Sequence, residues 1–214
     1  MWNWFLAGGP VMWPLLLCSL VSLTVIVERC LFWVKADLRQ DRNMGEQLLE
    51  DYRLGGPDWT PESAASGTAK GMIKGAITRM LLTGMAHHNF SSPKAMEAVA
   101  LDEISKMRRG MNVLDTIITV APMLGILGTV TGIITSFDML GQVGVDDPKA
   151  VVAGIAEALI TTAAGLVISV GTVFPYNYFN ARIDDAVALF EHYGTRLEIL
   201  ENTKTARLPH EAAP

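Results

Sequence analysis

Residues 113–137 have the sequence VLDTIITVAPMLGILGTVTGIITSF, and this stretch decides the fold class. Asp115 is its only Asp, Glu, Lys or Arg, and the other residues are mostly apolar, small or hydroxylated. A helix needs about 20 mostly apolar residues to cross the hydrocarbon core of a bilayer. The stretch is therefore long enough to be a transmembrane span, and residues 8–27 and 151–174 meet the same criterion.

The charged residues are segregated along the chain. Mean hydropathy is +0.30 although 18% of the residues are charged. Residues 28–112 contain 12 basic and 11 acidic residues, more than half of the 17 Lys and Arg and 22 Asp and Glu of the whole chain. This segment is therefore predicted to face water. Since lipid offers the backbone no hydrogen-bonding partner, the three spans are predicted to be helices.

The flanks of the three spans differ in basic charge, which predicts the orientation of the chain. Cytoplasmic flanks of membrane helices carry an excess of Lys and Arg. The basic flanks here contain Arg29, Lys35, Arg39 and Arg42 after the first span, Lys106, Arg108 and Arg109 before the second, and Arg182 after the third. The start of the chain has no charged side chain, and the loop 138–150 has three aspartates and one lysine. We therefore predict an N-terminus outside and a C-terminus inside.

These patterns predict an all-α polytopic membrane protein with three transmembrane helices, whose long helices extend into a cytoplasmic bundle. The predicted segments are a periplasmic N-terminus with the first span (1–34), a cytoplasmic helical segment (35–112), the second span (113–137), a periplasmic loop (138–150), the third span (151–175) and a cytoplasmic helix and tail (176–214). A Gly-, Pro- and Ser-rich link at 55–67 divides the cytoplasmic segment. Apolar spacing predicts that a helix from Ser92 runs straight into the second span, and that the third-span helix continues to Glu201.

Composition argues against several functions. The net charge of -5 gives no basic face for nucleic acid. Cys18 and Cys30 are twelve residues apart on one predicted helix, roughly 18 Å along its axis, so they cannot form a disulfide with each other. No Cys/His cluster is present, so neither a metal site nor a cofactor is expected. A membrane-embedded enzyme would need a nucleophile with a base, or a metal set, and the sequence shows neither, so we predict that the chain is not an enzyme.

The second and third spans each have one small, hydroxylated face. On a helical wheel at 100° per residue, these residues share one arc and aliphatic residues fill the opposite arc. The polar arc of the second span contains Gly125, Gly128, Thr129, Thr131, Gly132, Thr135 and Ser136, and that of the third contains Thr161, Thr162, Gly165, Ser169 and Thr172 beside Glu157. Small residues let membrane helices pack closely. Hydroxyls in such helices also often bond only their own backbone, so a purely structural role is the alternative.

Three further residues carry unusual chemistry for a membrane helix. Glu157 costs on the order of 2.5 to 3.5 kcal/mol to insert and is a candidate functional acid, although it is only about 9 Å along the helix from Val151 and could hydrate from the outer interface. Pro122 leaves a backbone carbonyl that a neighbouring helix or water must satisfy, so a kink or a wet site is expected there. Asp115, at the inner mouth of the second span, is interpreted as an interfacial or salt-bridged acid, with a place on a conduction path as the alternative.

Two motifs resemble the signature helices of the TolQ/ExbB/MotA proton-channel family. They are APMLGILGTVTG at 121–132, followed by Phe137, and GIAEALITTAAGL at 154–166. The close resemblance covers residues 113–181. Three spans with a large cytoplasmic segment after the first are similar to ExbB and TolQ, and unlike the four-span MotA. The resemblance leaves both ExbB and TolQ open as the nearer subfamily, and both protons and sodium as the ion.

The resemblance implies a homopentamer in the bacterial inner membrane. Such a ring would enclose transmembrane helices of a small partner like ExbD or TolR, whose membrane aspartate carries the proton, and a TonB- or TolA-like protein is a further candidate partner. By motif position, Thr129 and Thr162 match the family's pore-facing threonines and Glu157 matches its membrane glutamate. The additional hydroxyl of Thr161 leaves Thr161 and Thr162 as alternatives for the pore-facing position.

The function that the resemblance implies is that of a proton-channel (stator) subunit. It would use the proton motive force to energise its partner, and through it an envelope process such as outer-membrane transport or integrity. The alternative is a non-conducting membrane scaffold that assembles the helices of partner proteins. A secondary carrier acting alone is less well supported, because three spans offer no inverted repeat that could alternate.

Overall fold

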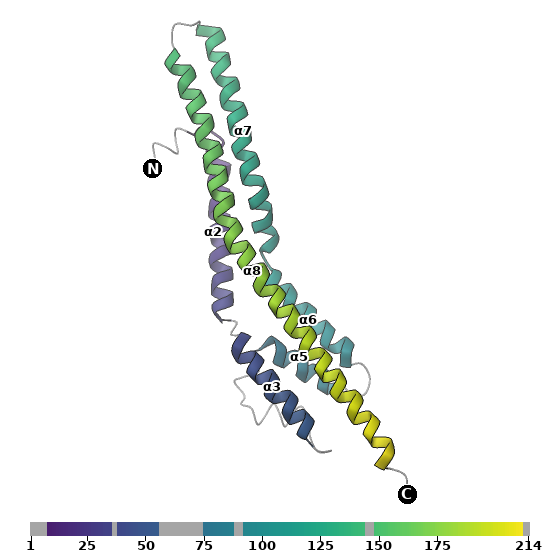
Figure 1. The fold of residues 1–214 in the computed structure, drawn as a ribbon. Helices are drawn as coiled ribbons and strands as arrows, with labels where there is room; N and C mark the ends of the chain where they lie inside the picture. The colour runs from purple at the N-terminus through teal and green to yellow at the C-terminus, as the bar shows by residue number, and fades with distance from the viewer. Residues whose placement is uncertain (1–7, 36–37, 56–74, 88–91, 144–147, 212–214) are drawn as a thin grey trace. The chain divides into compact units, whose positions relative to one another are not determined.

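Helices account for nearly all of the part of the chain that its structure describes. The computed structural model describes residues 8–35, 38–55, 75–87, 92–143 and 148–211. Within these ranges the helices are α2 (Met12–Lys35), α3 (Leu38–Leu54), α5 (Ala76–Ala86), α6 (Ser92–Arg108), α7 (Met111–Val143) and α8 (Pro148–Glu211) (Figure 1). The prediction of an all-α fold is confirmed.

Three helical stretches are long and apolar enough to cross a membrane. They lie within Met12–Val34, Ser92–Asp138 and Gly154–Thr203. Each corresponds to one of the three spans predicted from hydropathy, so the prediction of three membrane helices is confirmed. The chain is a multi-pass membrane protein.

The helix that starts at Ser92 is interrupted before the second span. It ends at Arg108, and α7 starts only at Met111. The prediction of one uninterrupted helix is therefore wrong. The physical reason lies at Gly110, whose φ of 79° is in the left-handed region that glycine adopts without steric cost. The Gly110 carbonyl then accepts hydrogen bonds from the N–H groups of Val113 and Leu114, at 3.1 and 3.3 Å, as the new helix begins.

The third-span helix has no such break. α8 is a single helix of 64 residues, Pro148–Glu211, so it continues to Glu201 as predicted and ends ten residues later. Most of the predicted link at 55–67 lies outside the described residues, as do residues 144–147 of the predicted periplasmic loop.

The chain divides into two compact units. Unit 1 combines Met1–Leu31 with Gly110–Phe179, and unit 2 combines Phe32–Arg109 with Asn180–Pro214. Unit 1 contains most of α2, all of α7 and the first part of α8. One buried apolar cluster of this unit consists of Leu15, Ile117 and Ala121, against which further apolar side chains pack: Val11, Met12, Cys18, Leu124, Ala164 and Ile168.

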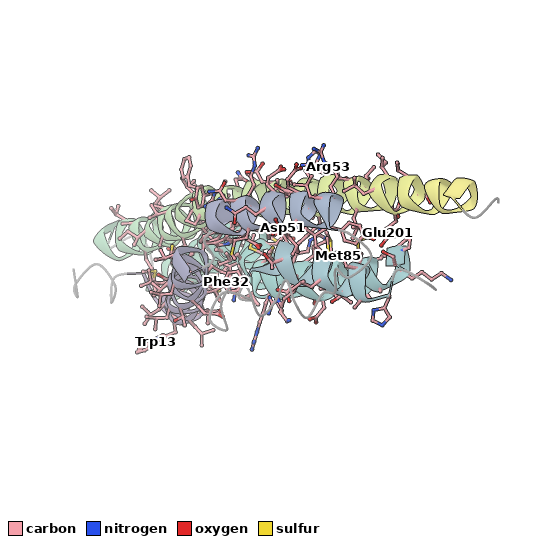
Figure 2. The ribbon with its side chains drawn as sticks, turned by 90° about the horizontal axis from the view of Figure 1, so that it is seen from below. Trp13, Phe32, Asp51, Arg53, Met85 and Glu201 are labelled. Atoms are coloured by element: carbon pink, nitrogen blue, oxygen red, sulfur yellow. The ribbon has the colours of Figure 1, made fainter. Side chains whose placement is uncertain are left out.

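Much of the outer surface of unit 1 is apolar. Figure 2 shows Trp13 projecting from α2, and its side chain is 61% exposed. Large aliphatic and aromatic side chains are also exposed on α7 and α8, among them Ile126, Val130, Phe137, Val167 and Phe174. Contiguous apolar surface of this kind is typical of protein that contacts lipid or another subunit.

Unit 2 is a helical bundle in which α5 packs against α3 and α6. The carboxylate of Asp41, on α3, accepts hydrogen bonds from the N–H groups of Ile77 and Thr78 at 2.8 and 3.1 Å, and so caps α5. The buried Tyr193 of α8 donates its hydroxyl towards the carbonyl of Arg42 and the carboxylate of Glu46. These contacts connect α3, α5 and α8 within the unit.

Glu46 and Arg196 provide a test of the packing of α3 on α8. Arg196 donates two hydrogen bonds to the Glu46 carboxylate, at 2.8 and 2.7 Å, and these hold the pKa of that carboxyl below its ordinary value. The stability that the pair contributes is therefore present above about pH 4.5, the ordinary value, and is lost as pH falls through the lowered pKa. Since both side chains are partly exposed, we expect Glu46→Gln to cost less than about 1 kcal/mol at neutral pH.

The measurement is the midpoint of thermal unfolding of the full chain in detergent, followed from pH 7 to pH 3. Glu50→Gln is the matched control, because Glu50 lies on the same helix and its ion pair within the described residues is with the exposed Arg53 one turn away. We expect Glu46→Gln to flatten the pH dependence and Glu50→Gln to leave it in place. An equal effect of both substitutions would contradict the assignment of the bond to Glu46.

Candidate functional site

The contact between α7 and α8 is built from small residues. A Cβ on Gly125 would lie 3.0 Å from the Cα of Thr162, and a Cβ on Gly165 would lie 2.5 Å from the carbonyl oxygen of Ala121. A Cβ on Gly132 would lie 3.0 Å from the Cβ of Ala158. The two backbones are thus too close for larger side chains, so the glycine spacing sets the distance between the helices.

Thr129 and Thr162 form a hydroxyl pair across this contact. Their Oγ1 atoms are 2.8 Å apart, and either can be the donor. Thr162 Oγ1 also lies 3.0 Å from the Gly125 carbonyl, and Thr129 Oγ1 is 3.1 Å from the same carbonyl and 2.9 Å from that of Ile126. Both side chains are only half-buried. The pair therefore lies at the edge of the helix contact, with hydroxyls that can both donate and accept.

Thr161 is placed differently from Thr162. Its side chain is 1% exposed, and its hydroxyl donates to the carbonyl of Ala158 in its own helix at 2.8 Å. It fills the space beside Gly128, where a Cβ would overlap the Thr161 hydroxyl. Thr161 therefore packs inside the contact of α7 with α8, whereas Thr162 lies at its edge.

Glu157 is half-buried and lies against the segment that precedes α2. Its Oε1 occupies the space that a Cβ on Gly9 would need, and Gly9 has a φ of 65°. The carboxyl thus lies beside the segment that leads into α2, nine residues after the start of α8 at Pro148. Thr162 is five residues after Glu157 on α8, a distance of about 7.5 Å along the helix axis.

Pro122 lies inside α7, which continues on both sides of it. A proline has no N–H, so the carbonyl of Ile118, four residues earlier, lacks its usual helical donor. The hydroxyl of Ser169 on α8 donates to this carbonyl at 2.7 Å. The neighbouring helix thus satisfies the freed carbonyl. This agrees with the prediction that a neighbouring helix or water satisfies it. Ser169 itself was not singled out, although its place on the polar arc and the position of Pro122 together pointed to it.

Asp115 is not part of this arrangement. It is exposed on α7, and it makes no ion pair with any residue in the described ranges. It is fourteen residues from Thr129, about 21 Å along a helix. The salt bridge considered for Asp115 is thus absent from the described part of the chain.

The described ranges offer no ligand set for a metal ion. No cluster of three or more His, Cys, Asp or Glu occurs there. Cys18 is half-buried and Cys30 is exposed, and both are free thiols.

The fold and this site define a class of protein: a multi-pass helical membrane protein with a close-packed helix pair that carries hydroxyls and one carboxyl group. Residues 70–192 match the MotA/TolQ/ExbB proton channel family. The chain belongs to this family, since the match covers more than half of its 214 residues.

Known relatives come from two branches of the family. An ExbB-like biopolymer transport protein of Synechocystis sp. is 34% identical over 98% of this chain and 82% of its own length. The biopolymer transport protein exbB1 of Vibrio cholerae is 29% identical over 86% of this chain and 81% of its own length. The Tol-Pal system protein TolQ of Pseudomonas aeruginosa is 32% identical over 75% of this chain and 70% of its own length.

Gly165 offers a test of the close contact between α7 and α8. In Gly165→Ala the new Cβ would meet the backbone carbonyl of Ala121, which cannot move without displacing the helix, so we expect a loss of about 1 to 3 kcal/mol in stability. Gly171→Ala is the matched control in the same helix, because nothing lies within 4 Å of its added Cβ. The measurement is unfolding of the purified chain by increasing SDS in mixed micelles. Equal stability of the two variants would contradict the close contact.

Proposed function

We propose that the chain is the proton-channel subunit of a bacterial inner-membrane motor, which uses the proton motive force to energise an ExbD- or TolR-like partner. Through that partner it would drive an envelope process such as outer-membrane transport or integrity. Family membership supports the channel role, and the names of the relatives support the link to biopolymer transport or the Tol-Pal system. The observation that carries the proposal is the bond between the hydroxyls of Thr129 and Thr162.

The hydroxyl pair suits a proton relay for a physical reason. Each hydroxyl donates one hydrogen bond while it accepts another, so the two groups can form part of a chain with ordered water that no aliphatic side chain could continue. Glu157, about 7.5 Å further along α8, would exchange protons with the end of this path. With the N-terminus outside, Glu157 and Gly9 lie toward the periplasm, and the path leads inward from there.

The partner's aspartate would convert proton flow into motion. A charged carboxylate inside a membrane carries a desolvation penalty, and protonation removes it. The preferred position of the partner helix inside the ring would therefore change with each proton, as rotation or rocking. A homopentamer around this helix is the arrangement we propose, with a TonB- or TolA-like protein as the next component. No catalytic reaction is assigned to the chain.

Thr162 is proposed as the pore-facing residue in preference to Thr161. Thr161 is buried within its own chain and its hydroxyl bonds its own helix, so it has no free side to offer to a pore. Thr162 is half-buried in the single chain and bonds the neighbouring helix. The pair of adjacent threonines therefore divides into one packing residue and one relay residue.

The second candidate function is a non-conducting scaffold. It is favoured by hydroxyls whose hydrogen bonds, as far as the described residues go, stay within their own helix, such as Thr131 to Leu127 and Ser136 to Gly132. In a scaffold, Thr129 and Thr162 would serve the same structural purpose. Measured proton flux separates the two functions, because the scaffold would assemble without conducting.

Thr162→Val tests the relay directly. Valine keeps the shape of threonine and removes the hydroxyl, so we expect assembly to be unchanged and proton uptake to fall by about 100-fold or more, the lower end of the range for loss of a proton-transfer group. The measurement is proton uptake into liposomes that contain the chain co-purified with its small partner, under an imposed potential.

Thr161→Val and Thr131→Val are the matched controls for this substitution. Each removes one hydroxyl whose hydrogen bonds within the described residues go to carbonyls of its own helix, so proton uptake should stay within about twofold of the unmodified chain. Unchanged uptake in a chain that carries both Thr161→Val and Thr162→Val would refute the relay.

A further inference from the structure

The carbonyl of Ile118 creates a demand for a hydrogen-bond donor inside the membrane. Pro122 cannot supply the N–H that this carbonyl would receive in an uninterrupted helix. In hydrocarbon an unmet backbone carbonyl is costly, and neighbouring hydroxyl side chains are one way to meet it. α7 nevertheless continues past this point to Val143, so the deficit has to be met from outside the helix.

Ser169 meets this demand, and it does so from α8. Its Oγ donates to the Ile118 carbonyl at 2.7 Å, and its side chain is only 8% exposed. Other buried hydroxyls of α8 behave differently: Thr172 bonds Ile168 in its own helix at 2.8 Å. Ser169 therefore bonds the neighbouring helix, whereas Thr172, which is also buried and lies on the same helix, does not.

A second hydroxyl of α8, that of Thr162, also donates to a carbonyl of α7, at the same sequence spacing on both helices. Thr162 donates to the carbonyl of Gly125, so seven residues separate the two donors on α8 and seven separate the two acceptors on α7. Figure 1 shows α7 and α8 side by side as a hairpin, running in opposite directions. Seven residues are about 10.5 Å of helix and return to the same face within about 20°. Two bonds at one interval fix both the sliding and the rotation of one helix on the other.

We propose that Ser169 is a positioning residue for the hydroxyl pair. By replacing the hydrogen bond that Pro122 removes, its hydroxyl sets the register of α8 on α7 and so places Thr162 within hydrogen-bond distance of Thr129. Pro122 and Ser169 then act as one unit: the proline frees the carbonyl, and the serine uses it as a fixed point. Without the serine, α8 retains only the fixed point at Thr162 itself.

The inference predicts that Pro122→Ala suppresses the effect of Ser169→Ala. Alanine at 122 restores the N–H for the Ile118 carbonyl, so the serine is no longer needed. The position of the pair can be read from the rate of disulfide formation between Thr129→Cys and Thr162→Cys in the full chain, with Cys18 and Cys30 replaced by alanine. We expect Ser169→Ala to slow this rate by about threefold or more, the effect of losing one hydrogen bond between membrane helices.

In the Pro122→Ala background, the same Ser169→Ala substitution should change the rate by less than about twofold, because the two sites are then uncoupled. Ser136→Ala is the matched control: Ser136 is 2% exposed, and its hydroxyl bonds Gly132 in its own helix at 2.8 Å. The effect of Ser136→Ala on the rate of disulfide formation should be the same with proline and with alanine at position 122. Equal slowing by Ser169→Ala in both backgrounds, or no slowing in either, would overturn the inference.

Proton uptake supplies a second readout, and only this one rests on the proposed function. With the natural threonines and the co-purified partner in liposomes, Ser169→Ala should lower uptake by about threefold or more, and Pro122→Ala should remove this difference. If the unmodified chain takes up no protons, the proposed function fails, whereas the disulfide rates still decide the role of Ser169.

Discussion

The close approach of α7 and α8 is the constraint on which the rest of unit 1 depends. The Gly125 backbone lies beside the Cα of Thr162, and Gly165 lies beside the carbonyl of Ala121. A larger side chain at either glycine would push the helices apart and lengthen the bonds that cross between them. Small residues thus have two consequences here: they bury backbone against backbone, and they bring hydroxyls on one helix within reach of carbonyls on the other.

Hydroxyls in this contact divide into two groups by where their hydrogen bonds go. Most, including Thr131, Thr161 and Ser136, bond a carbonyl of their own helix, as is common for threonine and serine in membrane helices. Thr162 and Ser169 instead bond carbonyls of α7. The second group couples the two helices, and Thr162 has in addition a half-exposed side that another molecule could reach. Polar groups in one helix pair thereby serve packing and, in the function we propose, the proton relay.

Periodicity and hydropathy were sufficient to predict the coarse structure, because a lipid-crossing helix needs length, apolarity and little else. They predicted three spans, the small faces of the second and third, and the continuation of α8. They did not predict the break at Gly110, because a glycine in a helical pattern does not reveal its φ. Thr161 and Thr162 are adjacent on one polar arc, and their different placements depend on where Gly128 faces. The contact of Glu157 with Gly9 was not predicted either, because it joins segments that are far apart in the sequence. Such features follow from tertiary packing, which a single helix pattern does not contain.

We propose that the hydroxyl pair at the edge of the α7–α8 contact faces an enclosed polar interior. A structure of the complete assembly with its small partner, determined by electron cryo-microscopy in a lipid nanodisc, tests this most directly. The account predicts that Thr129 and Thr162 line the interior opposite a carboxyl group of the partner, with Glu157 toward the periplasmic end. Density for acyl chains against these threonines, with the partner bound elsewhere, would contradict it.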